Sequence, residues 1–200
     1  MPAAIEFWFD FSSPYAYLAA GKIDALAEKY QRHADWHPIL LGVVFQTTGA
    51  VPIVQAPLKG EYSLHDIDRS ARFLGIPFRF PSRFPLPTQV AARAFYWLKD
   101  NAPATAKPFA LAIFHAFFVA DRDISDPDVV FDIAAEQGID RAALTQAAAM
   151  PEIKERLKQE TATAIGKGLF GAPYIIVDGE PFWGADRLPQ IETWLATGGF

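Results

Sequence analysis

The chain has 200 residues, of which 51% are hydrophobic and 20% charged, and its formal net charge is −5. This length suits one domain, or one domain with a large insertion, and this composition supports a substantial core. The acidic balance argues against a polyanion such as nucleic acid as a partner. Cysteine is absent, which excludes disulfide scaffolds, thiolate metal sites and redox chemistry by the protein's own thiols.

The N-terminus reads Met-Pro-Ala-Ala-Ile-Glu and lacks both the basic and the apolar region of a signal peptide. No apolar run reaches the ~18 residues that a membrane-spanning helix needs. We therefore expect a cytoplasmic protein that does not enter a membrane.

The first 60 residues predict a β-α-β unit. Ala4–Asp10 alternates in polarity, which indicates a strand with every second residue from Ile5 to Phe9 on one face. Pro14–Tyr30 has helical spacing and Ala34–Leu40 has the pattern of a second strand, so the two strands are expected to pair in parallel. The stretch 42–60, punctuated by Gly and Pro, is predicted to be an irregular loop over the edge of the sheet.

The middle of the chain has a helical pattern throughout. Six segments have helical period or composition, with boundary signals such as Pro103 and Pro151. These segments are Leu64–Leu74, Thr88–Lys99, Ala104–Ala120, Asp128–Gln137, Arg141–Ala149 and Pro151–Gly166.

Strand character returns near the C-terminus. Tyr174–Val177 is apolar and rich in β-branched residues, and Asp178-Gly179 is a strong signal for a type I′ hairpin turn. Glu180–Trp183 is the expected return strand, and Asp186–Leu195 is expected to form a closing amphipathic helix.

A β-α-β half and a β-β-α half around one four-stranded sheet make the thioredoxin arrangement. We therefore predict an α/β protein with a thioredoxin-like four-stranded sheet and a large all-helical insertion. Residues 1–60 and 167–200 would form the thioredoxin-like domain, and residues 61–166 the helical insertion domain.

The first strand ends abruptly at a helix that opens on Ser13-Pro14. Serine is a preferred N-cap and proline suits the first helical position, while the helix N-terminus favours negative charge. In thioredoxin-like folds the reactive group sits here and faces a proline that begins the third strand, often after a cis peptide. Ser13 is therefore either a plain cap or a reactive group, and we expect the Ala172-Pro173 bond to be cis.

Five motifs occur in order along the chain and carry a family resemblance. They are Phe9–Leu18 (FDFSSPYAYL), Leu40–Gly42, Lys59–Tyr62, Phe170–Pro173 and Trp183–Arg187. Together they resemble the 2-hydroxychromene-2-carboxylate isomerase family, from residue 4 nearly to the end of the chain. That family is related to the kappa-class glutathione transferases and, more distantly, to the DsbA-like disulfide oxidoreductases.

The resemblance implies a glutathione-dependent enzyme of aromatic catabolism that isomerises 2-hydroxychromene-2-carboxylate. Ser13 matches the family's catalytic serine, and its hydroxyl would stabilise the thiolate of glutathione and lower the pKa of that thiol. The thiolate would add transiently to the unsaturated substrate, and rotation followed by expulsion of the thiol would complete the isomerisation. Ser13 itself would not attack. The resemblance also implies a homodimer.

The resemblance implies further contacts to glutathione. The backbone at Ala172-Pro173 would pair with the cysteinyl residue, Asp186 would meet the γ-glutamyl ammonium, and Lys59 would lie near the glycyl carboxylate. Asp186 can instead cap the last helix, and Lys59 can be a solvated loop charge. Kappa-type members often carry Asn and Ser where this chain has Ala50 and Ala185, so two expected polar contacts to glutathione are missing.

Four aromatic residues flank the proposed site in sequence and are candidates for a pocket that holds a small aromatic carboxylate, with core packing as the alternative for each. They are Phe11, Tyr15, Phe45 and Trp183.

Two other functions fit the same residues: a kappa-like transferase that conjugates glutathione to electrophiles, and a silent thioredoxin-like binding module. No metal site is expected, because His33 and His37 lack a third ligand and the acidic run 121–128 lacks the glycine of an EF-hand. A hydrolytic triad of Ser12-Ser13 with His115 and Asp186 is not expected, because the nucleophile elbow Gly-x-Ser-x-Gly is missing.

Overall fold

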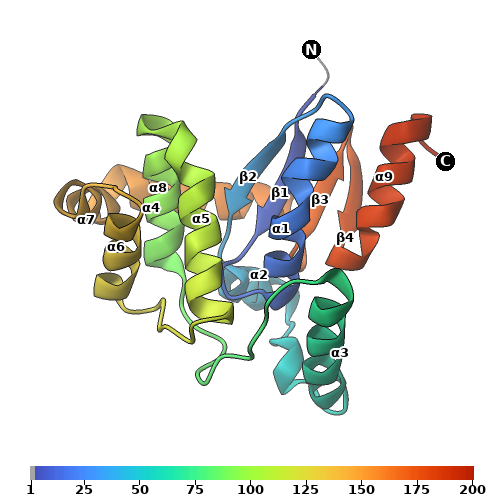
Figure 1. The fold of residues 1–200 in the computed structure, drawn as a ribbon, viewed down its shortest axis with the longest axis horizontal. Coiled ribbons are helices and arrows are strands. Elements are labelled where there is room, and N and C mark those ends of the chain that lie inside the picture. Colours follow the sequence, from blue (N-terminus) through green and yellow to red (C-terminus); the bar gives the residue numbers. More distant parts are fainter. Residues whose placement is uncertain (1–2) are drawn as a thin grey trace.

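The computed structural model describes residues 3–200 (Figure 1). Within them, four strands form one mixed sheet in the order β2-β1-β3-β4. The strands are β1 (Ile5–Phe9), β2 (Ala34–Pro38), β3 (Tyr174–Val177) and β4 (Glu180–Trp183). β1 runs parallel to β2 and antiparallel to β3, and β3 runs antiparallel to β4. The predicted thioredoxin-like sheet is therefore confirmed.

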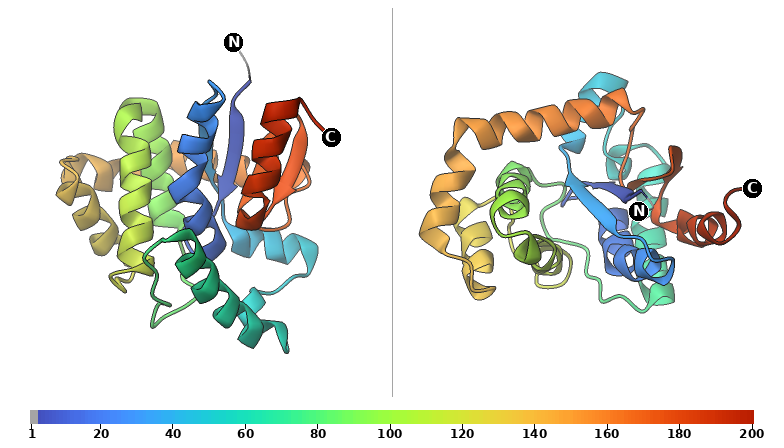
Figure 2. Two further views of the ribbon diagram at one scale, coloured as in Figure 1. Left: turned by 45° about the vertical axis from the view of Figure 1, so that its right-hand side comes forward. Right: turned by 90° about the horizontal axis from the view of Figure 1, so that it is seen from above.

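The alternation along β1 divides the buried side chains between the two faces of the sheet. Ile5, Phe7 and Phe9 join a large core that α1 (Pro14–Lys29) covers. Trp8 points to the opposite face and joins a smaller cluster. That second cluster includes Val44 from α2 (Leu41–Thr48) and Ala164 from α8 (Pro151–Gly166). In the view from above, α8 crosses the side of the sheet opposite α1 (Figure 2).

Four helices form a lobe beyond the β2 edge of the sheet (Figure 1). They are α4 (Gln89–Asn101), α5 (Pro103–Phe118), α6 (Pro127–Glu136) and α7 (Arg141–Ala149). α8 packs on both this lobe and β2. α3 (Lys59–Leu74) lies outside the lobe and packs on η1 (Ile53–Gln55) and α1. The division into a thioredoxin-like domain and an insertion at residues 61–166 stays a prediction.

The loop predicted for residues 42–60 is wrong for much of its length. α2 and η1 occupy most of it, and α3 begins at Lys59, five residues before the predicted start. The N-cap residues of α2 and α3, Leu40 and Leu58, make no side-chain capping bond, so neither helix begins at a side-chain cap of its own. The predicted C-terminal helix is divided into η2 (Ala185–Arg187) and α9 (Leu188–Thr197).

The remaining predicted strands and helices are confirmed within two residues at each end. Among residues 3–200, no helix combines the length and apolar character needed to cross a membrane.

Candidate active site

The site is centred on Ser13, which lies at the carboxyl end of β1 where α1 begins. Ser13 has extended backbone angles and its Oγ accepts a hydrogen bond from Ala16 N at 3.2 Å, so it caps α1. The same hydroxyl donates to the carbonyl oxygen of Ala172 at 3.0 Å, across 159 residues of sequence. A local helix cap is thereby tied to the loop that enters β3.

The N-terminus of α1 keeps one free donor. Pro14 has no N–H, and the N–H of Ala16 is bonded to Ser13. The N–H of Tyr15 has no hydrogen-bond partner anywhere in residues 3–200. An unpaired N–H at a helix N-terminus, beside a hydroxyl, is suited to bind an anion.

The Ala172-Pro173 peptide bond is cis, as predicted. The carbonyl of Pro173 accepts a hydrogen bond from Gly184 N at 3.0 Å, which anchors this loop to the end of β4. Within the described chain the N–H of Ala172 makes no hydrogen bond. Once Ser13 releases the Ala172 carbonyl, this residue can offer both a donor and an acceptor to an extended ligand backbone.

Asp66 belongs to the site, although the sequence did not reveal it. The hydroxyl of Tyr15 donates to Asp66 Oδ2 at 2.7 Å, linking α1 to α3. Asp66 also pairs with Arg69. Burial, the hydrogen bond to Asp66 and the negative charges of Asp66 and Asp186 together raise the pKa of Tyr15 far above its ordinary value. Tyr15 is therefore a neutral hydrogen-bond donor beside two carboxylates.

Asp186 lies in η2 and its side chain is 70% exposed, with Arg187 at 3.0 Å. It does not cap α9, whose N-cap residue is Arg187, so the capping alternative is wrong. Ala185 is buried beside it.

Lys59 is the first residue of α3 and is exposed, and no carboxylate of residues 3–200 lies within 4.0 Å of its ammonium group. Seven residues separate Lys59 from Asp66, which corresponds to about 10 Å along a helix. An extended tripeptide has a similar length of about 10 Å. The exposed ammonium group of Lys59 and the carboxylate of Asp66 therefore start from backbone positions about as far apart as the two ends of a short peptide.

Of the four predicted pocket residues, Phe11 does not line a pocket. It is fully buried and packs on Phe9 and Phe114 with ring centroids about 5 Å apart (5.1 and 5.2 Å). Trp183 is half-exposed and packs edge-on against Phe170 at 4.8 Å. The indole of Trp183 also lies directly against Gly171, the residue before Ala172.

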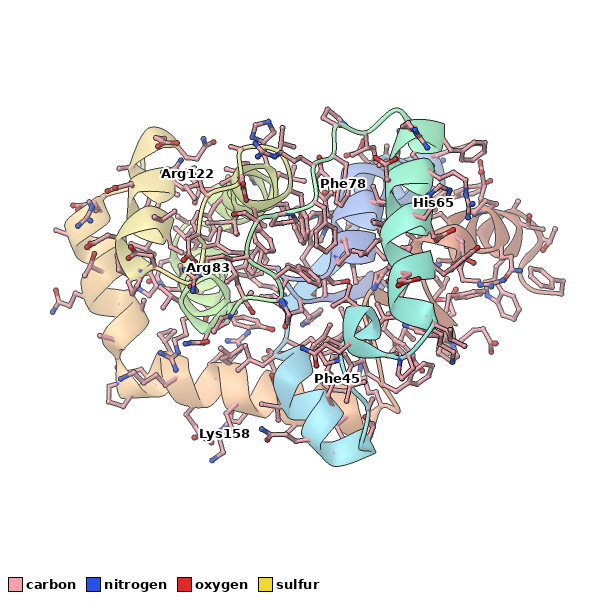
Figure 3. All side chains as sticks on the ribbon, turned by 90° about the horizontal axis from the view of Figure 1, so that it is seen from below. Phe45, His65, Phe78, Arg83, Arg122 and Lys158 are labelled. Atoms are coloured by element: carbon pink, nitrogen blue, oxygen red, sulfur yellow. The ribbon has the colours of Figure 1, made fainter. Side chains whose placement is uncertain are left out.

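Tyr15 is partly buried, and Phe45 is partly buried on α2. In the view from below, Phe45 lies on the side of α2 nearer to α3 (Figure 3). Tyr15, Phe45 and Trp183 therefore remain candidates for contact with an aromatic ligand.

Two hollows of about 400 and 350 Å³ lie away from Ser13, one between α5 and α6 and one beside β1, β2 and α8. The second contains His37, which bonds to Asp35 and Glu160 and not to His33. In the part of the chain that the structure describes, no group of three or more His, Asp or Glu side chains is arranged so that it could hold a metal ion.

Comparison with known proteins gives a consistent assignment. The family model described as "DSBA-like thioredoxin domain" matches residues 4–196. 2-Hydroxychromene-2-carboxylate isomerase from Sphingobium xenophagum is 28% identical over 197 residues, which cover 98% of this chain and 99% of that protein. Glutathione S-transferase kappa 2 from Caenorhabditis elegans is 28% identical over 209 residues, covering 96% and 91%.

A solved structure of 2-hydroxychromene-2-carboxylate isomerase is also similar to this chain. It has a TM-score of 0.86 and 27% sequence identity, and the match covers 97% of this chain and 95% of that one. The similarity therefore extends over the sheet, the lobe and the C-terminal helix together.

Proposed function

Because the chain belongs to the DsbA-like thioredoxin family, we propose that it binds glutathione at the N-terminus of α1 and is a glutathione-dependent isomerase of 2-hydroxychromene-2-carboxylate or a similar small aromatic carboxylate. The observation that carries the proposal is the position of the Ser13 hydroxyl, 3.0 Å from the Ala172 carbonyl at a cis proline. Full-length relatives named as this isomerase and as kappa transferases support it.

The described residues fit glutathione. Ser13 and the free N–H of Tyr15 supply donors for a thiolate, and Ala172 supplies backbone groups for the cysteinyl residue. Lys59 can pair with the glycyl carboxylate, and the exposed Asp186 can pair with the α-ammonium. Ala50 and Ala185 offer no side-chain contact, so the backbone carries more of the recognition.

When bound, glutathione supplies a thiolate nucleophile for reversible addition to the unsaturated substrate. Ser13 would stabilise the negative charge of that thiolate. Its O–H turns from the Ala172 carbonyl toward the sulfur, while its Oγ still accepts from Ala16 N. The hydroxyl, the Tyr15 N–H and the dipole of α1 stabilise the anion and so lower the pKa of the thiol.

Ser13→Ala tests this role. The variant should lose isomerase turnover by about a hundredfold or more, since one donor to the reacting charge is removed. Calorimetry should show that the wild type prefers glutathione to S-methylglutathione, which has no ionisable thiol, and that Ser13→Ala loses this preference. Ser125→Ala, a serine in the lobe that bonds only to Asp123, is the matched control. Absence of glutathione binding by the wild type would disprove the proposal.

A kappa-like transferase is the second candidate, favoured by the 28% identity to a kappa enzyme over nearly the whole chain. Turnover of a chlorinated nitroaromatic with glutathione, and none of the chromene carboxylate, would select it.

The proposal includes a homodimer in the cytoplasm. Exposed apolar side chains on α3, such as Phe73 and Tyr62, support self-association, which sedimentation equilibrium measures directly.

A further inference from the structure

Asp10 is a buried carboxylate next to the site that the proposed chemistry does not use. It directly follows β1 and is only 4% exposed. Its backbone carbonyl accepts a hydrogen bond from Ser13 N at 2.9 Å. An acidic side chain with so little solvent contact needs a compensating set of donors.

Three donors converge on this carboxylate. Oδ1 accepts from Ser12 N at 2.8 Å and from the hydroxyl of Thr88 at 3.0 Å, and Oδ2 accepts from Leu41 N at 2.8 Å. Each donor stands where a helix begins. Ser12 precedes the cap of α1, Leu41 is the first residue of α2, and Thr88 is the N-cap residue of α4.

The three helices differ in how much they depend on Asp10. α2 has no capping bond from Leu40, so Asp10 provides the carboxylate at its N-terminus. Thr88 makes no capping bond to α4, and its hydroxyl donates to Asp10. Ser12 extends the connection, since its Oγ accepts from Leu86 N at 3.1 Å in the segment before α4.

We propose that Asp10 is a positioning residue, which fixes the starts of α1, α2 and α4 relative to one another and so holds Ser13 and the Tyr15 N–H in the geometry that stabilises a thiolate. The thiolate part rests on the proposed function, whereas the joining of the three helix starts does not.

The negative charge of Asp10 and the geometry that it holds should have opposite effects on the pKa of a bound thiol, so an experiment can tell them apart. Burial raises the pKa of Asp10, while hydrogen bonds from Leu41, Ser12 and Thr88 oppose that rise and favour the anion. A buried anion close to Ser13 disfavours a second anion there. Removing the charge alone would therefore lower the pKa of a bound thiol, whereas losing the geometry would raise it.

The experiment compares Asp10→Asn with the wild type in the ultraviolet absorbance of bound thiolate, titrated with pH. The NH₂ group of Asn cannot accept a hydrogen bond, so at least one of the three groups that donate to Asp10 loses its acceptor. The expected result is a higher thiol pKa, with about tenfold less thiolate at fixed pH. An unchanged or lower pKa would overturn the proposal. Asp24→Asn is the matched control, because Asp24 is also on the Ser13 helix but bonds to Trp36 and Lys107.

Amide hydrogen exchange tests the same proposal without glutathione. In Asp10→Asn, residues 10–16, 39–45 and 86–92 should all exchange faster, and in Asp24→Asn they should not. Unchanged protection in those segments would overturn the positioning role, whether or not the wild type binds glutathione. Failure of the wild type to bind glutathione would by itself count only against the proposed function. If Asp10→Asn does not fold, Thr88→Val removes one donor with no change of charge and should shift both readouts in the same direction by less.

Discussion

At the scale of single residues, Ser13 is both a structural cap and the proposed thiolate ligand. The cap could be predicted from Ser-Pro after a strand, and the facing proline from Ala172-Pro173, because both signals are local. The bond between Ser13 and Ala172 joins residues that are 159 positions apart. It could be expected only once the thioredoxin arrangement had been inferred, because that arrangement brings the two segments together. Asp66 could not be found, because its partner Tyr15 lies 51 residues away and no pattern marks the pair.

Tyr15→Phe measures what the Tyr15–Asp66 bond contributes. The variant keeps the ring but leaves the half-buried carboxylate of Asp66 with one donor fewer. We expect the free energy of unfolding to fall by about 1 to 2 kcal/mol, the range for a hydrogen bond to a charged group that is partly solvated. Urea denaturation gives the value. Tyr30→Phe alters a partly exposed tyrosine whose hydroxyl makes no hydrogen bond within residues 3–200 and should change stability by less than about 0.5 kcal/mol. Equal effects of the two substitutions would refute the assignment.

At the scale of elements, two of the helices that could be predicted well from the sequence carry their own side-chain caps. Asp126 and Asp140 bond to the first turns of α6 and α7, and both helices were predicted nearly to the residue. α2 takes its carboxylate from Asp10, 31 residues earlier in the chain. A start signal supplied from another strand is invisible to local pattern analysis, which explains why residues 42–60 were predicted as a loop.

His37 joins β2 to α8. It lies between Asp35 at 3.0 Å and Glu160 at 3.2 Å, and its ring stacks on Trp8 at 4.2 Å. A neutral imidazole can donate to one carboxylate only, whereas the protonated ring donates to both. Burial and the nearby Lys99 lower the pKa of His37, but the hydrogen bonds to Asp35 and Glu160 outweigh them, so the pKa is raised.

The raised pKa fixes the sign of a pH effect. The stabilisation by His37 is fully present below the pKa of an unfolded histidine, near 6.5, and disappears as the pH rises through the higher folded value. Burial raises the pKa of Asp35 and of Glu160, but the hydrogen bonds to His37 and to their other cationic partners lower both more. The stabilisation that Asp35 and Glu160 contribute is therefore lost only at acidic pH, as their carboxylates become protonated. The contact between β2 and α8 is strongest at about pH 5 to 6.

His37→Gln tests this contact. The loss of unfolding free energy relative to the wild type should be largest at about pH 5 to 6 and shrink as the pH rises from about 6.5 through the raised folded pKa of His37. Thermal unfolding across this range supplies the comparison. His33→Gln, four residues away and exposed, should show no such trend, and a pH-independent loss for His37→Gln would contradict the ionic account.

At the scale of the whole molecule, one aromatic core joins the sheet to the lobe. Phe114 of α5 lies 5.6 Å from Phe9 of β1, 5.2 Å from Phe11 and 5.9 Å from Tyr17 of α1. The 17 phenylalanine residues of the sequence do not by themselves indicate that one aromatic core would be shared between the two parts of the chain.

Phe114→Ala should therefore destabilise the whole protein. Phe114 is fully buried, and the cost expected for such a truncation is about 3 to 5 kcal/mol. Chemical denaturation followed by far- and near-ultraviolet circular dichroism should give coincident transitions. Val51→Ala truncates an apolar side chain that is 53% exposed and should cost less than about 0.5 kcal/mol. Separate transitions for lobe and sheet would show that the core is not shared.

The shared core also limits how a ligand would reach Ser13 at the proposed site, because Ser13 is only 5% exposed. Opening the lobe away from the sheet would expose the rings around Phe114 to water, and that hydrophobic cost works against a large movement. We infer that a ligand enters beside Trp183 and Phe170, whose rings are half-exposed and in contact with each other. Under the proposed function, exchanging these two rings is expected to change which substrates are accepted while the scaffold stays unchanged.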